Sequence, residues 1–345
     1  MFLTKSGEEI FVIDAHIHFW DGSIENQKNI HGEQFVSCFY HYHTSLSPKE
    51  YHWSKDKFRK YDEQTLINDV FLMGYADMAI FNPQRLTDFY KEPFGNVEKE
   101  SQLVKKYPGR FIGNGNFDPR AGEEGLNELE DQYNKYGLKG VKLYTAEWRG
   151  QSKGWSLSDP WAKRYLEKCR DLGIKNIHIH KGPTVTPLNI DAFDVSDVDD
   201  VATEFRDLNF IVEHVGLPRL EDFCWIATQE PNVYAGLSVV MPFVYARPRY
   251  FAEIMSELLF WLDEDRILFG SDYAIWEPGW LIEKFMEFEL PEDIQEETGV
   301  TVDLSTKKKI LGKNAARLYD IDIDTQKEKI KDDSISKMKK DLTNV

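Results

Sequence analysis

The 345-residue sequence has few cysteines, no excess of positive charge and no long apolar run, and each shortage excludes a class of protein. Its three cysteines are widely spaced and odd in number, which supports neither a disulfide framework nor a cysteine-based zinc site. Because 42 Lys and Arg face 59 Asp and Glu, the net charge is −17, and nucleic acid or an anionic membrane would be repelled. No signal-peptide pattern opens the chain, and no stretch approaches the ~18 uncharged apolar residues of a membrane span. We therefore expect a cytoplasmic protein that binds neither nucleic acid nor membrane.

Glycine motifs that cradle phosphates are also missing. No Gly-x-Gly-x-x-Gly turn follows the first strand-like run, and no Gly-x-x-x-x-Gly-Lys occurs, so a nucleotide site has no support in the sequence. What the chain does contain is 41% hydrophobic and 14% aromatic residues, a composition far from that of disordered proteins. A globular protein with a sizeable core is expected.

Short β-branched runs alternate with amphipathic segments of helical period along most of the chain. The expected strands are Ile10–His16, Met78–Phe81, Arg110–Asn116, Gly140–Tyr144, Lys175–His180, Asn209–His214, Val233–Leu237 and Arg266–Ser271. The expected helices between them include Leu126–Tyr136, Asp159–Leu172, Asp197–Asp207, Arg219–Gln229, Tyr250–Leu262 and Gly279–Phe288. Eight such repeats predict an α/β fold with the parallel strands rolled into a (β/α)8 TIM barrel. An open doubly wound sheet is the second choice.

Two segments fall outside the eight repeats. Residues 20–61 are rich in aromatic residues and histidine and follow the first strand, where the active-site loops of a barrel belong, so they are a candidate lid. Residues 321–345 are rich in Lys and Asp and poor in large apolar residues, which predicts a charged, flexible tail behind the C-terminal helical extension. The sequence thus predicts one barrel domain over residues 1–320.

A His-x-His motif ends the first expected strand. Side chains at i and i+2 of a strand share one face, so His16 and His18 can point together into the barrel mouth and chelate one divalent ion. Asp14 shares that face one step deeper, where it is expected to support the interior or orient a ligand.

Further ionisable side chains stand near the ends of three later strands. They are His178 and His180 on the fifth, Glu213 and His214 on the sixth, and Asp272 after the eighth. Nitrogen and oxygen donors from separate strand ends suit Zn²⁺ or another first-row divalent ion. His178 and His180 lie on the same face, so spacing alone allows either of them to be a ligand.

These motifs, in this order, resemble the amidohydrolase superfamily. The resemblance is to the amidohydrolase-related branch, which contains aminocarboxymuconate semialdehyde decarboxylase, γ-resorcylate decarboxylase and lactonase-like hydrolases. It covers about residues 10 to 319. It rests on the segments 14–18, 140–144, 180–182, 214–216, 270–273 and 310–319.

The resemblance implies a set of roles for individual residues. It makes His16, His18, His180 and Asp272 the ligands of one divalent ion, with zinc first and manganese, cobalt or iron as alternatives. It makes His214 the histidine that acts on substrate or on the water at the metal.

Substrate contacts are expected on the loops around this site. Binuclear members of the superfamily carry a carboxylated lysine on the fourth strand, but the decarboxylase branch holds one metal, so Lys142 is interpreted as a positively charged site residue. Tyr144, Trp148 and Arg247 follow strands and are candidate substrate contacts. They suit a small, flat or apolar molecule that carries an anionic or carbonyl group.

Three functions are open at this point. In the first, the protein is a metal-dependent hydrolase in which Asp272 takes a proton from the attacking water and His214 polarises the scissile carbonyl. In the second, the same residues serve a non-oxidative decarboxylase of an aromatic or unsaturated acid. In the third, the barrel is a non-catalytic accessory to another enzyme, which four convergent ligands argue against. A homodimer is the expected assembly, since relatives with this barrel often pair through barrel-side helices.

Overall fold

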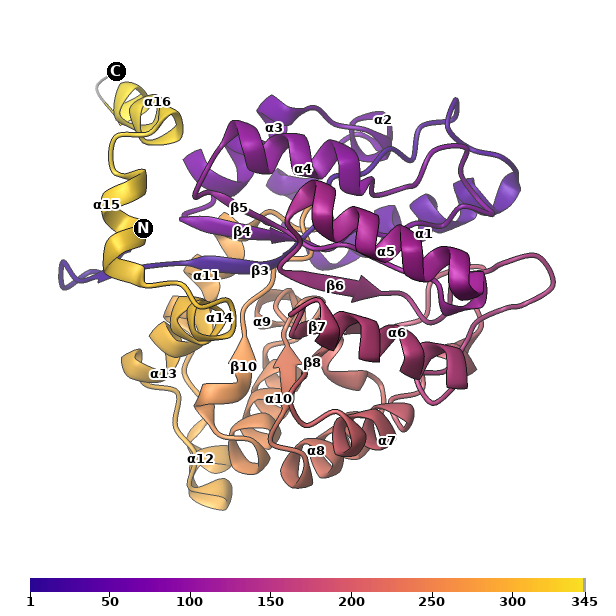
Figure 1. Ribbon diagram of the computed structural model, residues 1–345. Coiled ribbons are helices and arrows are strands. Elements are labelled where there is room, and N and C mark those ends of the chain that lie inside the picture. Colours follow the sequence, from indigo (N-terminus) through magenta and orange to yellow (C-terminus); the bar gives the residue numbers. More distant parts are fainter. Residues whose placement is uncertain (344–345) are drawn as a thin grey trace.

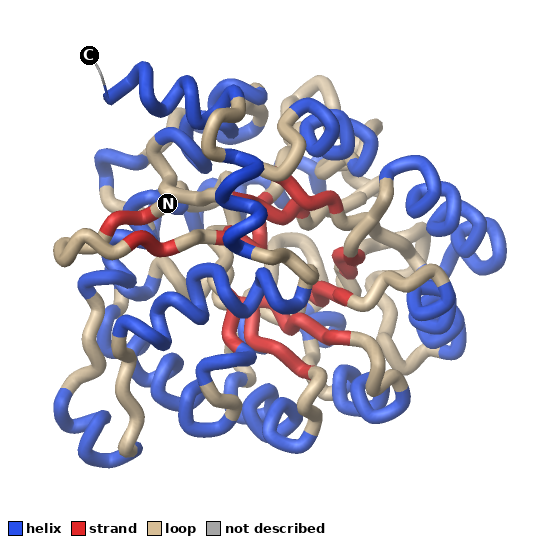
Figure 2. Tube along the Cα trace, turned by 60° about the vertical axis from the view of Figure 1, so that its left-hand side comes forward, coloured by secondary structure: helices blue, strands red, loops and turns tan. Residues whose placement is uncertain are grey.

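The computed structural model describes residues 1–343 and has eight short parallel strands at its centre with helices around them (Figures 1 and 2). The strands are β3 (Ile13–Ile17), β4 (Met78–Phe81), β5 (Phe111–Gly113), β6 (Gly140–Leu143), β7 (Asn176–His180), β8 (Asn209–Glu213), β9 (Val233–Gly236) and β10 (Ile267–Leu268). Strands β3 to β5 form one sheet and β6 to β10 another, each in chain order. The predicted α/β barrel architecture is confirmed.

Single bridges link the two sheets at both edges. Gly115, after β5, pairs with Val141 of β6, and Tyr273, after β10, pairs with Ile17 of β3, both in parallel orientation. Parallel pairing places the carboxyl ends of all eight strands at the same end of the barrel, where the predicted site residues are found. The strands are almost fully buried, as expected for parallel strands covered by helices on their outer side.

Helices alternate with the strands and cover their outer surface (Figure 2). The helices of the repeats are α4 (Val97–Lys106), α5 (Gly122–Tyr136), α6 (Pro160–Asp171), α7 (Asp197–Glu204), α8 (Leu220–Gln229), α10 (Pro248–Trp261) and α11 (Pro278–Glu287). Short helices between these repeats and after the last strand are α3 (Glu63–Ile67), α9 (Phe243–Ala246), α12 (Glu292–Thr298), α13 (Leu304–Lys308) and α14 (Asn314–Leu318). Among residues 1–343, no helix has the length and apolar character needed to cross a membrane.

The insertion after β3 is a packed helical layer. It contains α1 (Ile30–Leu46) and α2 (Lys55–Arg59). The Tyr42 hydroxyl donates to the carbonyl oxygen of Thr184 after β7, and His43 Nδ1 lies 2.7 Å from the carbonyl oxygen of Ile275 after β10. These bonds fasten the insertion to loops at the carboxyl end of the barrel.

The predicted flexible tail is corrected over residues 321–343, which form α15 (Ile323–Ile330) and α16 (Ser334–Thr343). Ile330 and Ile335 are buried, and Arg110 binds Asp333 through a two-atom ion pair of 2.6 and 3.0 Å. Figure 1 shows both helices on the side of the molecule where the N-terminus lies. Composition did not reveal these helices, because a few apolar residues are enough to hold a helix in place when the surface it packs on comes from elsewhere in the chain. Residues 344 and 345 of the predicted tail lie outside the described residues.

Candidate metal centre

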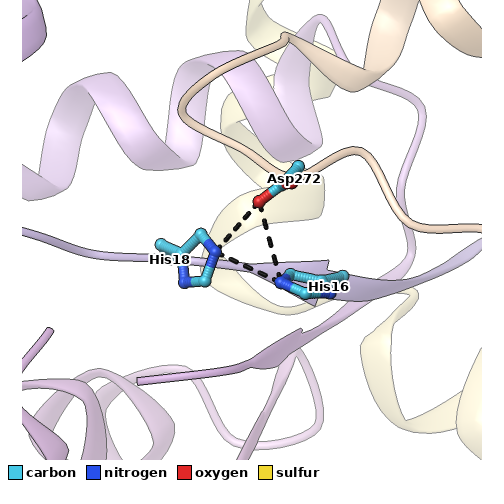
Figure 3. A group of neighbouring side chains, drawn as sticks. All are labelled: His16, His18 and Asp272. Atoms are coloured by element: carbon cyan, nitrogen blue, oxygen red, sulfur yellow. Dashed lines mark hydrogen bonds and ion pairs between the residues drawn. The ribbon is translucent and has the colours of Figure 1, made fainter. Parts of the chain in front are cut away.

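One histidine of β3, one histidine directly after it and one aspartate after β10 converge at the carboxyl end of the barrel (Figure 3). The Nε2 atoms of His16 and His18 are 3.2 Å apart. Oδ1 of Asp272 lies 3.0 Å from Nε2 of His18 and 3.7 Å from Nε2 of His16. Strand alternation brings the histidines to one face, and a backbone bond from Asp272 N to His16 O places the aspartate beside them. All three side chains are buried.

The second ring nitrogen of each histidine has a partner that determines where the proton lies. Nδ1 of His18 is 2.7 Å from the carbonyl oxygen of Asn82, which can only accept, so Nδ1 must donate. Nδ1 of His16 is 2.8 Å from the Glu213 carboxylate and donates to it. With one proton on each ring, both Nε2 atoms carry lone pairs that face each other and Asp272.

This arrangement of acceptors fits a cation. Burial lowers the pKa of His16 to about 3, so its imidazole is neutral near pH 7. Burial alone would raise the pKa of Asp272, but His16 and His18 hold it below its usual range, so its carboxylate is ionised. Imidazole nitrogens and a carboxylate are ligands that Zn²⁺ and other first-row divalent ions accept. Metal-binding histidines also typically donate their other N–H to a carboxylate or a carbonyl, as both do here.

His180 and His214 lie next to each other, beside this group of three. Nδ1 of His214 is 2.8 Å from the carbonyl oxygen of Ser238 and donates to it, so Nε2 of His214 is an acceptor. Nδ1 of His180, at 3.0 Å, donates to that Nε2. Nε2 of His180 is left as a buried acceptor that makes no hydrogen bond within the described part of the chain. The group of possible metal ligands formed by His16, His18 and Asp272 does not include His180. The role of His180 as a fourth metal ligand therefore stays a prediction, which the unused lone pair on its Nε2 supports.

His178, the alternative ligand on the same strand, has both ring nitrogens engaged. Its Nδ1 is 2.6 Å from Glu213 Oε1 and its Nε2 is 2.7 Å from the Tyr319 hydroxyl. Of the two histidines on β7, therefore, His180 alone keeps an unused nitrogen over the described residues.

Glu213 has a role that the sequence analysis did not assign. Its carboxylate binds His16 and His178 and accepts a hydrogen bond of 2.9 Å from the Ser238 hydroxyl. Burial alone would raise its pKa, but the neighbouring His16 and Lys142 and the bonds from both histidines hold it well below the usual range. A charged residue at the last position of an otherwise apolar strand was the signal that could have identified it.

Lys142 and Tyr144 are buried on β6 and just after it, two residues apart on one face. Burial lowers the pKa of Lys142 to about 8, although the charges of Glu213 and Asp272 oppose this shift. The Tyr144 ring lies 4.4 Å from the ring of His180. Neither the Lys142 ammonium nor the Tyr144 hydroxyl has a hydrogen-bond partner among residues 1–343. Both are donors available to a substrate oxygen.

The other two predicted substrate contacts lie against different residues. Trp148 packs on His31 and Phe89, with ring centroids 5.0 and 5.2 Å apart. Arg247 is exposed and its guanidinium stacks on Tyr250. Among residues 1–343, neither Trp148 nor Arg247 makes a hydrogen bond or ring contact with His16, His18 or Asp272, and their role as substrate contacts stays a prediction. Position after a strand was the whole basis for predicting them, and loop positions of that kind are often solvated.

Two of the predicted catalytic residues have a left-handed backbone. The φ angles of His214 and Asp272 are 64° and 58°. This region costs a non-glycine residue on the order of 1 kcal/mol or more, and such residues are common at functional sites. At His214 this turn directly follows the last residue of β8.

A family model described as "Amidohydrolase" matches residues 13–321 of the chain. This range includes all the predicted ligands and catalytic residues, which are His16, His18, His180, His214 and Asp272. The chain belongs to the amidohydrolase family. The resemblance stated from the sequence motifs is thereby confirmed. No curated protein sequence matches the chain.

Solved structures with the same fold as this amidohydrolase include enzymes of two reaction classes. An uncharacterised TIM-barrel protein from Bordetella bronchiseptica is 18% identical with a TM-score of 0.64, over 90% of this chain and 98% of that one. A 5-carboxyvanillate decarboxylase from Novosphingobium aromaticivorans with bound manganese is 14% identical with a TM-score of 0.55, over 93% and 100%. An amidohydrolase from Burkholderia multivorans with bound zinc is 14% identical with a TM-score of 0.58, over 90% and 100%. At these identities the likeness shows the fold alone.

Proposed function

We propose that this amidohydrolase is a metal-dependent hydrolase of a small substrate that bears a carbonyl or carboxylate group. The observation that carries the proposal is the convergence of the buried His16, His18 and Asp272, whose Nε2 atoms and carboxylate oxygen lie 3.0 to 3.7 Å from one another. One divalent ion is the proposed cofactor, zinc first, with manganese, cobalt or iron as alternatives. The metals named for the two metal-containing neighbours support this choice.

When bound, such an ion lowers the pKa of a water molecule from 15.7 towards ~7. Asp272 is the proposed proton acceptor, because its carboxylate is ionised and lies 3.0 Å from Nε2 of His18 and 3.7 Å from Nε2 of His16. The same carboxylate can pass the proton on to the leaving group.

His214 is proposed to polarise the scissile carbonyl, and its contacts set a condition for this role. Its Nδ1–H is committed to Ser238 O, while its Nε2 accepts from His180. A proton directed at the substrate must therefore reside on Nε2 as a second ring proton, so His214 has to take up a proton and the bond from His180 has to open. The proposed roles of His180 as ligand and His214 as electrophile are coupled through this one hydrogen bond.

Lys142 and Tyr144 are proposed to bind the substrate's oxygen atoms. Both are buried donors without partners over the described residues, a costly situation that a carbonyl or carboxylate oxygen would relieve. In a protein of net charge −17, a local ammonium also offsets the repulsion of an anionic substrate.

Non-oxidative decarboxylation of an aromatic or unsaturated acid is the second candidate. The buried ammonium of Lys142 favours it, since a substrate carboxylate is the partner that this charge suits best. In that reaction Asp272 or His214 would deliver a proton to the carbon that loses carbon dioxide.

One experiment separates the two reactions. The metal content of the purified protein is measured, and the zinc-loaded and manganese-loaded forms are screened against esters, lactones, amides and aromatic acids. Hydrolysis and carbon dioxide release are scored separately, with chelator-treated protein as the control. Metal-dependent cleavage that consumes water supports the proposal, whereas carbon dioxide release without water consumption overturns it in favour of the lyase. Stoichiometric metal without turnover of any substrate overturns both reactions and favours an accessory role.

A further inference from the structure

A buried chain of hydrogen bonds runs through the barrel beneath the metal centre. Glu213, which binds His16, also binds Nδ1 of His178 at 2.6 Å. Nε2 of His178 is 2.7 Å from the hydroxyl of Tyr319, which in turn lies 3.1 Å from Nδ2 of Asn114. Glu213, His178 and Asn114 are each 1% exposed and Tyr319 is half-buried, so the bond between Glu213 and His178 is shielded from water.

The direction of every donor in this chain follows from the acceptor at its end. The Glu213 carboxylate can only accept, so His178 must carry its proton on Nδ1 and offer a lone pair on Nε2. The Tyr319 hydroxyl then donates to that lone pair and accepts from the amide nitrogen of Asn114. The hydroxyl also lies 3.3 Å from Asn114 Oδ1, a longer contact than its 2.7 Å to His178. Tyr319 thus stabilises the one neutral tautomer of His178 that can hold Glu213.

The same hydrogen-bond network reaches His18, the second proposed metal ligand. The Asn114 amide also donates to Asn82 Oδ1 at 3.1 Å, and the Asn82 amide donates to the backbone carbonyl of Ala15 at 2.9 Å. The backbone carbonyl of Asn82 is the acceptor that fixes the proton of His18. Tyr319 lies directly after α14, outside the eight strands, and so ties the C-terminal segment to both histidines of the proposed metal site.

We propose that Tyr319 and His178 are positioning residues, which hold the Glu213 carboxylate where it orients His16 for metal binding. Without the Tyr319 hydroxyl, Nε2 of His178 becomes a buried acceptor with no donor. The alternative tautomer satisfies Nε2 no better and turns the Nδ1 lone pair against Glu213. Either outcome loosens the carboxylate that fixes the Nδ1 proton of His16. Loss of such outer contacts to a metal-binding histidine typically costs ~10–100-fold in metal affinity.

The test measures metal affinity and needs no substrate. The dissociation constant for Zn²⁺ is determined by competition with a chromophoric chelator for the parent, Tyr319→Phe and Tyr165→Phe. Tyr165 is a matched control, because its hydroxyl also donates one hydrogen bond, to the carbonyl oxygen of Gly122, and contacts no member of the network. Tyr319→Phe is expected to raise the dissociation constant at least about tenfold, and Tyr165→Phe is expected to leave it unchanged. Equal affinities of Tyr319→Phe and the parent overturn the inference.

A second variant separates this positioning role from a general loss of stability. In His178→Asn, an amide nitrogen occupies the place of Nδ1 and donates to Glu213 with no tautomer to select. Metal affinity is expected to stay near that of the parent, and adding Tyr319→Phe is expected to change it by no more than about twofold, the limit of additive behaviour. If the second substitution weakens binding equally in both backgrounds, Tyr319 acts by another route and the proposal is wrong. Absence of metal binding by the parent would refute the proposed function as well, so the two failures can be told apart.

Discussion

Replacing Gly182 with alanine is expected to displace His214 and to impair catalysis while leaving the barrel folded. Gly182 follows β7, two residues after His180, and its Cα packs directly against the side chain of His214. A Cβ atom on residue 182 would lie 2.5 Å from His214 Cβ, 2.8 Å from Cγ and 2.7 Å from Cδ2.

The size of the effect follows from these distances. Carbon atoms in contact normally lie ~3.5–4.0 Å apart, so residue 182 or His214 must move by on the order of 1 Å. The atom in conflict is a Cβ beside the backbone, which cannot swing away as the end of a long side chain can. Overpacking of this kind costs ~1–3 kcal/mol, and a 1 Å misplacement of a reacting group costs on the order of 100-fold in rate. The shift also strains the bonds of His214 to Ser238 and His180.

The assay pairs kcat/KM for the substrate found in the screen with thermal unfolding. Gly182→Ala is expected to lower kcat/KM by about 100-fold. Its melting temperature is expected to fall by roughly 2–12 °C, given ~2–4 °C per kcal/mol for a large domain. Gly113→Ala is the matched control, since its Cβ would meet one atom, Val104 Cγ2, at an ordinary 3.5 Å. If Gly182→Ala kept the rate and melting temperature of the parent, the close approach of Gly182 to His214 would have no functional meaning.

Three further predictions follow from other contacts. Asp272→Asn should abolish turnover with the fold largely preserved, as judged by circular dichroism, and unchanged activity would remove Asp272 from the mechanism. Burial lowers the pKa of His43 from 6.5 to about 4. Between these pH values the unfolded chain therefore binds more protons, and stability falls as the pH drops from 6.5 to about 4 by on the order of 3 kcal/mol. His43→Gln should reduce the change of the free energy of unfolding between pH 6.5 and 4, measured by urea denaturation. An unchanged slope would contradict the lowered pKa of His43 as the cause. Arg110→Ala should destabilise the protein by about 2–3 kcal/mol and expose α15 and α16 to protease, because Asp333 loses its partner. Cleavage no faster than in the parent would count against this anchor.

Periodicity located the barrel strands closely but not their ends. The expected strand Met78–Phe81 coincides with β4, whereas Arg266–Ser271 shrinks to Ile267–Leu268. Beyond Leu268 the backbone bonds mainly to residues of β3 and to Ile310, as in the bond from Ala15 N to Phe269 O. Pairing with a distant strand decides where a short strand ends, and hydrophobic pattern carries no information about it.

Contacts between residues far apart in the chain could not be predicted either. The Tyr319 hydroxyl meets His178, 141 residues away, and no local pattern signals that approach. The contacts of Trp148 and Arg247 could not be predicted for a related reason, because the direction of a loop side chain depends on what it packs against. The helices α15 and α16 are stabilised by a surface to which Arg110 and the N-terminal residues contribute.

By itself, the sequence determined the fold class and the candidate metal-binding motif. Alternation of strands and helices allows few architectures, and parallel strands place His16, His18 and Asp272 at one end of the barrel. The tertiary structure alone decided which nitrogen of each histidine carries a proton, because that depends on acceptors from Asn82, Glu213 and Ser238 on other strands and loops. It also decided which histidine of β7 keeps, over residues 1–343, an unused ring nitrogen that could bind a metal ion, namely His180. Chemistry at this site depends on proton positions, and proton positions depend on neighbours that only folding supplies.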